Sequence, residues 1–176
     1  YDEMLGLGNA YMEGCALSGE GDVNGDGYDD VLIGSYSNSY VYVFNGPITA
    51  TLDASDRSTY IGGDYDDRFG QEAVLLGDLN GDGYDDVVVG AYSADDVDYT
   101  VGKVYLFHGP TTGSMSDSDA DSTMIGVGNS AQAGMSVSTC RDVNDDGQQD
   151  LLIGGANEAW LVLGPVSGTM ALENAE

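Results

Sequence analysis

Three acidic loops carry the side chains best suited to chemistry in this 176-residue sequence. Each loop has aspartate at position one, asparagine at position three, aspartate at position five, glycine at position six and aspartate at position nine. The loops cover residues 22–30, 78–86 and 142–150. Alternate side chains of such a tight loop converge on one centre, and the glycine permits the sharp bend. The donors are hard oxygens without histidine or cysteine, which favours Ca2+ over a transition metal.

The spacing predicts five ligands in each loop, with position seven contributing its backbone carbonyl. The predicted ligands are Asp22, Asn24, Asp26, Tyr28 and Asp30 in the first loop, Asp78, Asn80, Asp82, Tyr84 and Asp86 in the second, and Asp142, Asn144, Asp146, Gln148 and Asp150 in the third. The third site survives the change to Gln148, because a backbone carbonyl needs no particular side chain. Gln149 removes a neighbouring carboxylate, so we expect weaker affinity there. The sequence thus predicts three Ca2+ sites.

Two alternatives compete with this prediction. An EF-hand or dockerin loop needs an acidic ligand at position twelve and a following helix. Position twelve is Ile33, Val89 or Ile153, an apolar residue within a strand-like run, and this rejects the EF-hand geometry. The other alternative is a turn that binds nothing, since Asp, Asn and Gly are ordinary turn formers. Three copies at matched positions favour the cation site.

The loops lie between short apolar runs that predict β-strands. These runs are rich in Val, Ile, Leu, Tyr and Phe, Gly and Asp separate them, and no stretch has a helical period. For the middle unit we expect strands at Thr59–Ile61, Gln71–Leu76, Val87–Gly90 and Lys103–His108. The last of these is apolar on both alternations, so it should be buried between two layers. The predicted fold class is all-β, with stacked four-stranded antiparallel units that form β-propeller blades.

The repeats divide the chain into one array of three units, at approximately 1–57, 58–121 and 122–176. Propellers have about four to eight blades, so three repeats are incomplete as a closed propeller. Joining the tail of the sequence to its head recreates an internal connector. We therefore expect Tyr1–Gly6 to complete a last blade, of its own chain or of a neighbouring one. The chain is either a window from a longer propeller or a protomer that joins others head to tail.

Charge excludes several partners. The chain has 31 Asp and Glu against 4 Lys and Arg, a formal net charge of −27. Nucleic acids and anionic membranes would repel such a surface. No apolar run approaches the roughly 18 residues needed to span a bilayer, so membrane insertion is not expected. The acidity suits a saline or calcium-rich exterior, which predicts an extracellular or cell-surface location.

The remaining reactive residues do not predict an enzyme. His108 is the only histidine, and the sequence places no nucleophile or orienting group beside it. Cys15 and Cys140 are too few for a disulfide framework and lack metal-site spacing. They are expected to be buried free thiols, with a bridge between chains as the alternative.

The units resemble the FG-GAP repeats of the integrin α-subunit β-propeller and its bacterial relatives. Phe69-Gly70 stands at the FG position of the middle unit, and Gly90-Ala91-Tyr92 stands at the GAP position with Tyr in place of Pro. The outer units depart further from the pattern, with Glu13-Gly14 and Gly34-Ser35-Tyr36 in the first and Ala133-Gly134 and Gly154-Gly155-Ala156 in the third. The resemblance implies a propeller in which Ca2+ rigidifies loops on one face and catalyses nothing.

Together these features predict a non-enzymatic, extracellular calcium-binding module for adhesion, recognition or head-to-tail self-assembly. Its expected partners are Ca2+ and either further copies of the chain or a protein or glycan ligand. The alternative is a propeller accessory module of a larger secreted enzyme or surface receptor, of which this chain is a fragment. A flanking catalytic domain would favour the alternative, and Ca2+-dependent polymers of the chain alone would favour self-assembly.

Overall fold

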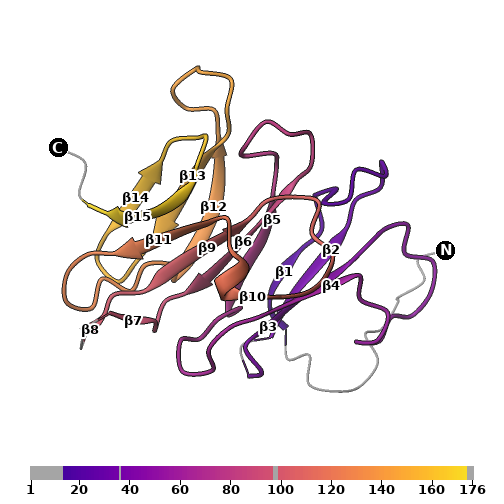
Figure 1. The fold of residues 1–176 in the computed structure, drawn as a ribbon, viewed down its shortest axis with the longest axis horizontal. Helices are drawn as coiled ribbons and strands as arrows, with labels where there is room; N and C mark the ends of the chain where they lie inside the picture. The colour runs from indigo at the N-terminus through magenta and orange to yellow at the C-terminus, as the bar shows by residue number, and fades with distance from the viewer. Residues whose placement is uncertain (1–13, 36, 97–98, 174–176) are drawn as a thin grey trace.

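The computed structural model describes residues 14–35, 37–96 and 99–173, in which three larger sheets lie side by side (Figure 1). We call the sheets blades 1, 2 and 3 in chain order. Blade 1 contains β1 (Gly14–Ser18), β2 (Val31–Ser35), β3 (Tyr40–Phe44) and β4 (Thr59–Gly62). Blade 2 contains β5 (Glu72–Leu76), β6 (Asp86–Ala91), β9 (Lys103–Phe107) and β11 (Ser122–Gly126), and blade 3 contains β12 (Ser136–Arg141), β13 (Asp150–Gly154) and β14 (Ala159–Val162).

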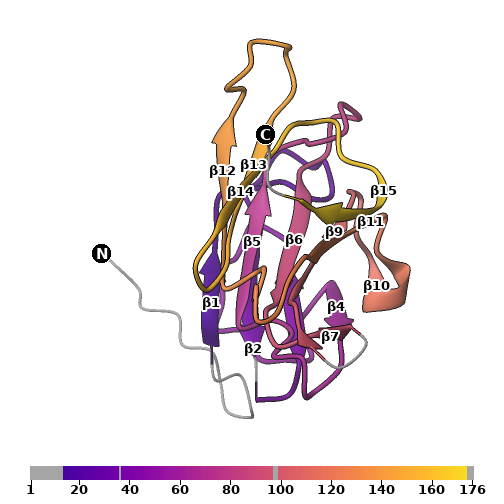
Figure 2. The same cartoon turned by 90° about the vertical axis from the view of Figure 1, so that its left-hand side faces the viewer.

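The predicted all-β fold is confirmed. These strands pair antiparallel within each blade, and Figure 2 shows β1, β5 and β12 on one side of the molecule with β10, β11 and β15 on the other. A short two-stranded ribbon, β7 (Asp95–Asp96) and β8 (Tyr99–Thr100), projects from blade 2. Within the described residues the helical structure is the three-residue turn η1 (Asp117–Asp119), so no helix there is long enough to cross a membrane.

The boundary between sheets falls one strand later than the boundary between sequence repeats. The repeat pattern groups Thr59–Ile61 with the second unit, but β4 pairs antiparallel with β3 and forms the outer strand of blade 1. In the same way, β11 follows the second connector and forms the outer strand of blade 2, opposite β9. Each connector therefore returns the chain to complete the blade that it has just left.

Blades 1 and 2 each have a fifth strand in addition to the four antiparallel strands that the sequence predicted. β10 (Gly113–Ser116) pairs parallel with β4, and β15 (Gly168–Leu172) pairs parallel with β11. Each fifth strand comes from the connector of the following blade and lies on the outer edge of the preceding one. Beside β10, the Thr59 hydroxyl donates to the Thr111 carbonyl at 2.9 Å. These strands fasten neighbouring blades along their outer edges.

Apolar side chains fill the two interfaces between blades. Blade 1 contributes Leu32 and Val43 to the first interface, where they share a buried cluster with Tyr105 and Phe107 of blade 2. The opposite face of blade 2 forms the second cluster with blade 3; its members include Val88, Val104, Leu106, Met124, Leu151, Ile153, Trp160 and Val162. Strand β9 is thus buried on both faces, as the sequence predicted.

The outer face of blade 3 has no such cover. Leu152 and Leu161 are paired across β13 and β14 and are 42% and 49% exposed, whereas Val88 and Leu106 at the equivalent places of blade 2 are 0% exposed. Among the described strands, none pairs with the outer edge of β14. Tyr1–Gly6, which we expected to complete a last blade, lies outside the described residues.

Packing between blades predicts that truncating Phe107 costs more stability than truncating Leu161. Phe107→Ala, in the interface of blades 1 and 2, should lower the free energy of unfolding by about 3–5 kcal/mol because it opens a cavity. Leu161→Ala, on the open face of blade 3, should cost less than about 1 kcal/mol. Urea unfolding measures both values, and equal losses would contradict the assignment of these faces.

Candidate metal-binding loops

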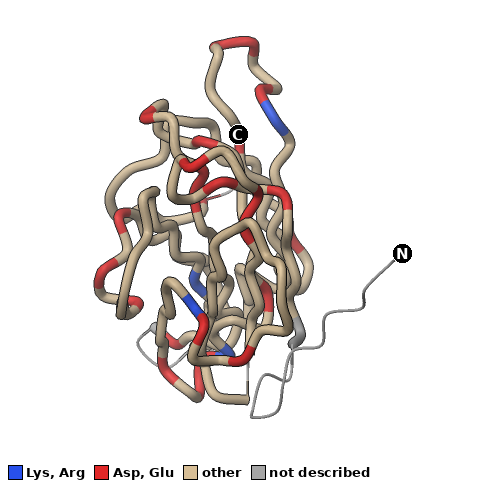
Figure 3. Tube along the Cα trace, turned by 90° about the vertical axis from the view of Figure 1, so that its right-hand side faces the viewer, with Lys and Arg blue, Asp and Glu red and all other residues tan. Residues whose placement is uncertain are grey.

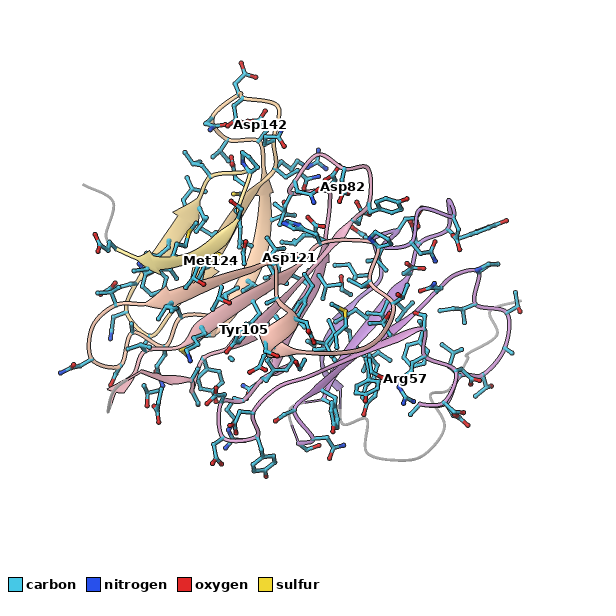
Figure 4. All side chains as sticks on the ribbon, in the orientation of Figure 1. Arg57, Asp82, Tyr105, Asp121, Met124 and Asp142 are labelled. Carbon is cyan, nitrogen blue, oxygen red and sulfur yellow. The ribbon has the colours of Figure 1, made fainter. Side chains whose placement is uncertain are left out.

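The three acidic loops lie along the same edge of the blade array. Each loop joins the first and second strands of its blade, β1 to β2, β5 to β6 and β12 to β13. Because the blades share one strand order, these hairpin loops open in the same direction (Figure 1). Figure 4 labels Asp82 and Asp142 in neighbouring loops at this edge. The repeated sequence motif therefore places three acidic loops in a row along this edge.

Hydrogen bonds from the backbone hold the first loop in a tight curl. Asp22 Oδ1 accepts from the backbone N–H groups of Gly25 at 2.7 Å and Asp26 at 3.1 Å, and Asp22 Oδ2 accepts from Gly27 at 2.7 Å. Asn24 Oδ1 accepts from Asp26 N–H at 2.8 Å. Asp26 Oδ1 accepts from Tyr28 N–H at 3.0 Å. Oxygens of positions one, three and five are thereby fixed within one short loop.

The second and third loops repeat this network. Asp78 Oδ1 accepts from Asp82 N–H at 3.1 Å, and Asp142 Oδ1 accepts from Asp146 N–H at 3.1 Å. The bonds to the glycine at position six are 2.7 Å in both loops. Asp146 also accepts from Gln148 N–H at 2.8 Å, so the change from Tyr to Gln leaves the loop geometry intact.

Glycine at position six is required by the backbone. Gly27, Gly83 and Gly147 have φ values of +86°, +92° and +88°, a region that other residues rarely adopt. Position four is also left-handed in each loop, and in the third it is Asp145 with φ +62°. Aspartate tolerates this conformation better than most residues. The shared backbone explains why the same turn recurs despite different side chains.

The aspartates at position nine have a structural role that the sequence analysis missed. Asp30, Asp86 and Asp150 are buried, and both oxygens of each accept backbone hydrogen bonds. Oδ2 accepts from the residue at position two, with distances of 2.7–2.9 Å, and Oδ1 accepts from a glycine just after the third strand, with distances of 2.8–3.0 Å. These glycines are Gly46, Gly109 and Gly164. The sequence signal for this contact is the Gly-Pro pair that recurs after the third strand of each blade, because its glycine is the donor to position nine.

Position nine therefore joins the base of the loop to its own blade. Gly109 shows the closeness of this contact, because an added Cβ would lie 2.5 Å from Tyr84 Cβ and 2.7 Å from the Asp85 carbonyl oxygen. A carboxylate oxygen that accepts one N–H bond retains a second lone pair. The buried aspartates can thus serve the fold and still offer an oxygen to a cation.

The environment separates the pKa values of positions one and nine. Desolvation alone would raise the pKa of Asp22, but hydrogen bonds from Gly27, Gly25 and Asp26 outweigh it and lower that pKa below its usual value. At Asp142 the bond from Gly147 is the largest effect and lowers the pKa. Burial raises the pKa of Asp30 and Asp86, against the effect of their backbone donors. In the first and second loops position one is therefore the more readily ionised group.

The donor chemistry of the loops suits a hard cation, although carboxylates alone do not make a site. No three His, Cys, Asp or Glu side chains in the described part of the chain gather as a metal cluster. Each loop instead supplies carboxylates at positions one, five and nine, an asparagine oxygen at position three and a backbone carbonyl at position seven. Oxygen donors of this kind bind Ca2+. The donor types of each loop are therefore those that Ca2+ prefers, although the carboxylates of a loop do not gather around one point in the described structure.

His108 and Cys140 are the other residues with reactive side chains that the sequence analysis singled out within the described part of the chain. His108 Nδ1 is 3.2 Å from Asp86 Oδ2, so the histidine stands at the base of the second loop. Cys140 is a free, half-buried thiol rather than a fully buried one, and desolvation raises its pKa. The side chain of Cys15 lies outside the described residues. Figure 3 shows acidic residues along the loops and connectors, with few basic residues among them.

The fold and loops define a repeat protein built from β-propeller blades. Residues 22–89 match the family described as FG-GAP-like repeat. The chain is also 31% identical to integrin alpha pat-2 of Caenorhabditis elegans over 169 residues, covering 82% of this chain and 14% of the relative. It is 30% identical to integrin alpha-4 of Xenopus laevis over 148 residues, covering 76% and 13% of the two chains. Against human integrin alpha-11 the identity is 32% over 159 residues, covering 80% and 12%.

The chain belongs to the FG-GAP, integrin α-like family. It spans about one seventh of the length of these relatives.

The double hydrogen bond of position nine predicts a stability effect that needs no cation. In the presence of a chelator, Asp150→Ala should lower the free energy of unfolding by about 2–4 kcal/mol, because the buried carboxylate is removed and two backbone N–H groups lose their acceptor. Asp146→Ala, an exposed change in the same loop, is the matched control and should cost less than about 1 kcal/mol. Denaturant unfolding with chelator separates the two, and a neutral Asp150→Ala would refute the structural role.

Proposed function

We propose that this chain is a non-catalytic, extracellular Ca2+-binding β-propeller module that serves adhesion, recognition or head-to-tail assembly. The observation that carries the proposal is the row of three loops with the same hydrogen-bonded curl and the same oxygen donors. The family of the chain supports an adhesion-type module, since the relatives are integrin α chains. Three Ca2+ ions would lower the excess of negative charge at the loop edge.

In this proposal the loops hold the ion and the blades hold the loops. The N–H donors lower the pKa of Asp22 and Asp142 at position one, which favours the carboxylate form that binds a cation. The asparagine, the second aspartate and the carbonyl at position seven complete the curl. Position nine connects the ion to the end of the third strand through the same carboxylate. A bound Ca2+ would therefore tie the exposed loop to the buried part of its blade.

Head-to-tail assembly is the finer part of the proposal, and the open end of blade 3 supports it. Leu152 and Leu161 lie at places that are fully covered in blade 2, and a groove runs between β14 and β15 beside the unpaired edge. The first blade of a second copy would cover the apolar face, and the segment Tyr1–Gly6 of that copy would pair with β14. The alternative is that further repeats of a longer secreted enzyme or surface receptor cover this end.

Calcium binding predicts a defined stoichiometry. Calorimetric titration of the chelator-treated protein should give three Ca2+ per chain, and Asp22→Ala should remove one of them. Asp29→Ala is the control, since Asp29 is exposed and is not a predicted ligand. Ligand binding should also raise the stability, by about 2.7 kcal/mol per site at a hundredfold excess over Kd. Three loops that take up no Ca2+ would end this proposal.

Assembly is tested separately from binding. Light scattering in Ca2+ should give masses that are multiples of the 18.3 kDa chain, with Leu161→Lys reducing association and leaving the Ca2+ stoichiometry unchanged. A compact monomer at all concentrations would reject self-assembly and favour the fragment of a longer protein.

A further inference from the structure

Position eight of the second loop reaches across to the first loop. The backbone N–H of Asp22 donates to Asp85 Oδ2 at 2.7 Å, and the backbone N–H of Asp85 donates to the Asp22 carbonyl oxygen at 3.1 Å. These two bonds form a reciprocal pair between residues 63 positions apart. Asp22 is position one of its loop, the residue around which the first curl is built. A side chain of blade 2 thus fixes the backbone of a predicted ligand in blade 1.

A second contact connects the same two loops. The ring of Tyr84 lies so close to Gly25 that an added Cβ on the glycine would stand 2.7 Å from Tyr84 Cε1. Gly25 is in the left-handed region, with φ +73°, and its N–H donates to Asp22 Oδ1. The ring therefore rests on the part of the first loop that wraps around Asp22. Movement of either loop would disturb both contacts.

The contact between the second and third loops has a different chemistry. There Gln149 stands at position eight and packs over Gly77, with no space for a Cβ on that glycine. Its Oε1 accepts a bond from the Thr139 hydroxyl at 3.3 Å, within its own blade. The neutral amide fills space but brings no carboxylate to the second loop. A carboxylate at position eight therefore connects the first and second loops, whereas a neutral amide packs between the second and third.

The exposed Asp29 provides an internal comparison. It occupies position eight of the first loop and is exposed, as is the neighbouring Tyr28 at 53%. Asp85 and Tyr84 occupy the same positions in the second loop and are half-buried against the first. The repeat thus contains one copy of the position-eight aspartate with a partner loop and one copy in solvent.

We propose that Asp85 is a positioning residue for the first loop and couples cation binding in the first and second loops. The inference rests on the proposed Ca2+-binding function. Asp85 is not a ligand of the first loop; it acts through the backbone of Asp22. Ordering the second loop around an ion fixes Asp85, which lowers the entropy lost when the first loop closes on its own ion. The carboxylate also lies between the two loops, where it offsets the repulsion between two dications.

The test compares Asp85→Ala with Asp29→Ala by Ca2+ titration, both in an Asp142→Ala background that removes the third site. Asp85→Ala should weaken binding to the first loop about tenfold or more and make the two remaining sites independent, because a charge-assisted hydrogen bond is lost. Asp29→Ala should leave both affinities unchanged. Asp85→Asn, which keeps an acceptor without the charge, should give an intermediate effect.

Amide hydrogen exchange supplies a readout that needs no cation. In chelator, the amide of Asp22 should exchange faster in Asp85→Ala than in the parent protein, and the amides of the third loop should not change. Failure of the parent protein to bind Ca2+ in any loop would overturn the proposed function and this inference with it. Normal Ca2+ binding, with equal affinities in Asp85→Ala and Asp29→Ala, would overturn the coupling alone.

Discussion

The buried carboxylate at position nine is the constraint on which the acidic loops depend. In each blade one side chain binds the start of the loop and the end of the third strand, so three chain segments meet at a single group. Its two backbone donors offset part of the cost of burying that carboxylate. Everything nearer the solvent, including the curl around position one, is built on this anchored base. A loop without it would be an acidic turn with no fixed relation to its blade.

Two kinds of contact between blades are combined in the array. Apolar clusters hold the faces together, with Tyr105 and Phe107 on one side of blade 2 and Leu106 and Met124 on the other. Polar contacts connect the loops at one edge, through Asp85 and Tyr84. The first kind buries apolar surface between the blades, and the second fixes the position of the first loop relative to the second. The conformation of the first loop therefore depends on residues of blade 2 as well as on its own blade.

The sequence predicted what depends on local spacing. The strand runs, the hairpin loops and the left-handed glycine at position six all follow from residues within about a dozen positions of one another. The sequence did not predict β10 and β15, because segments such as Gly113–Ser116 are polar and become strands only against the edge of another blade. It also missed the partner of Asp30, since Gly46 lies 16 residues away and meets the loop only in the folded blade.

The fifth strands change what must be broken to separate neighbouring blades. Because β10 and β15 run parallel to the outer strands of the preceding blades, they place four or more paired residues between successive blades. Separating two neighbouring blades would therefore require breaking these hydrogen bonds as well as the apolar contacts between the faces. The fifth strands thus connect the stacked sheets through backbone hydrogen bonds as well as through packing.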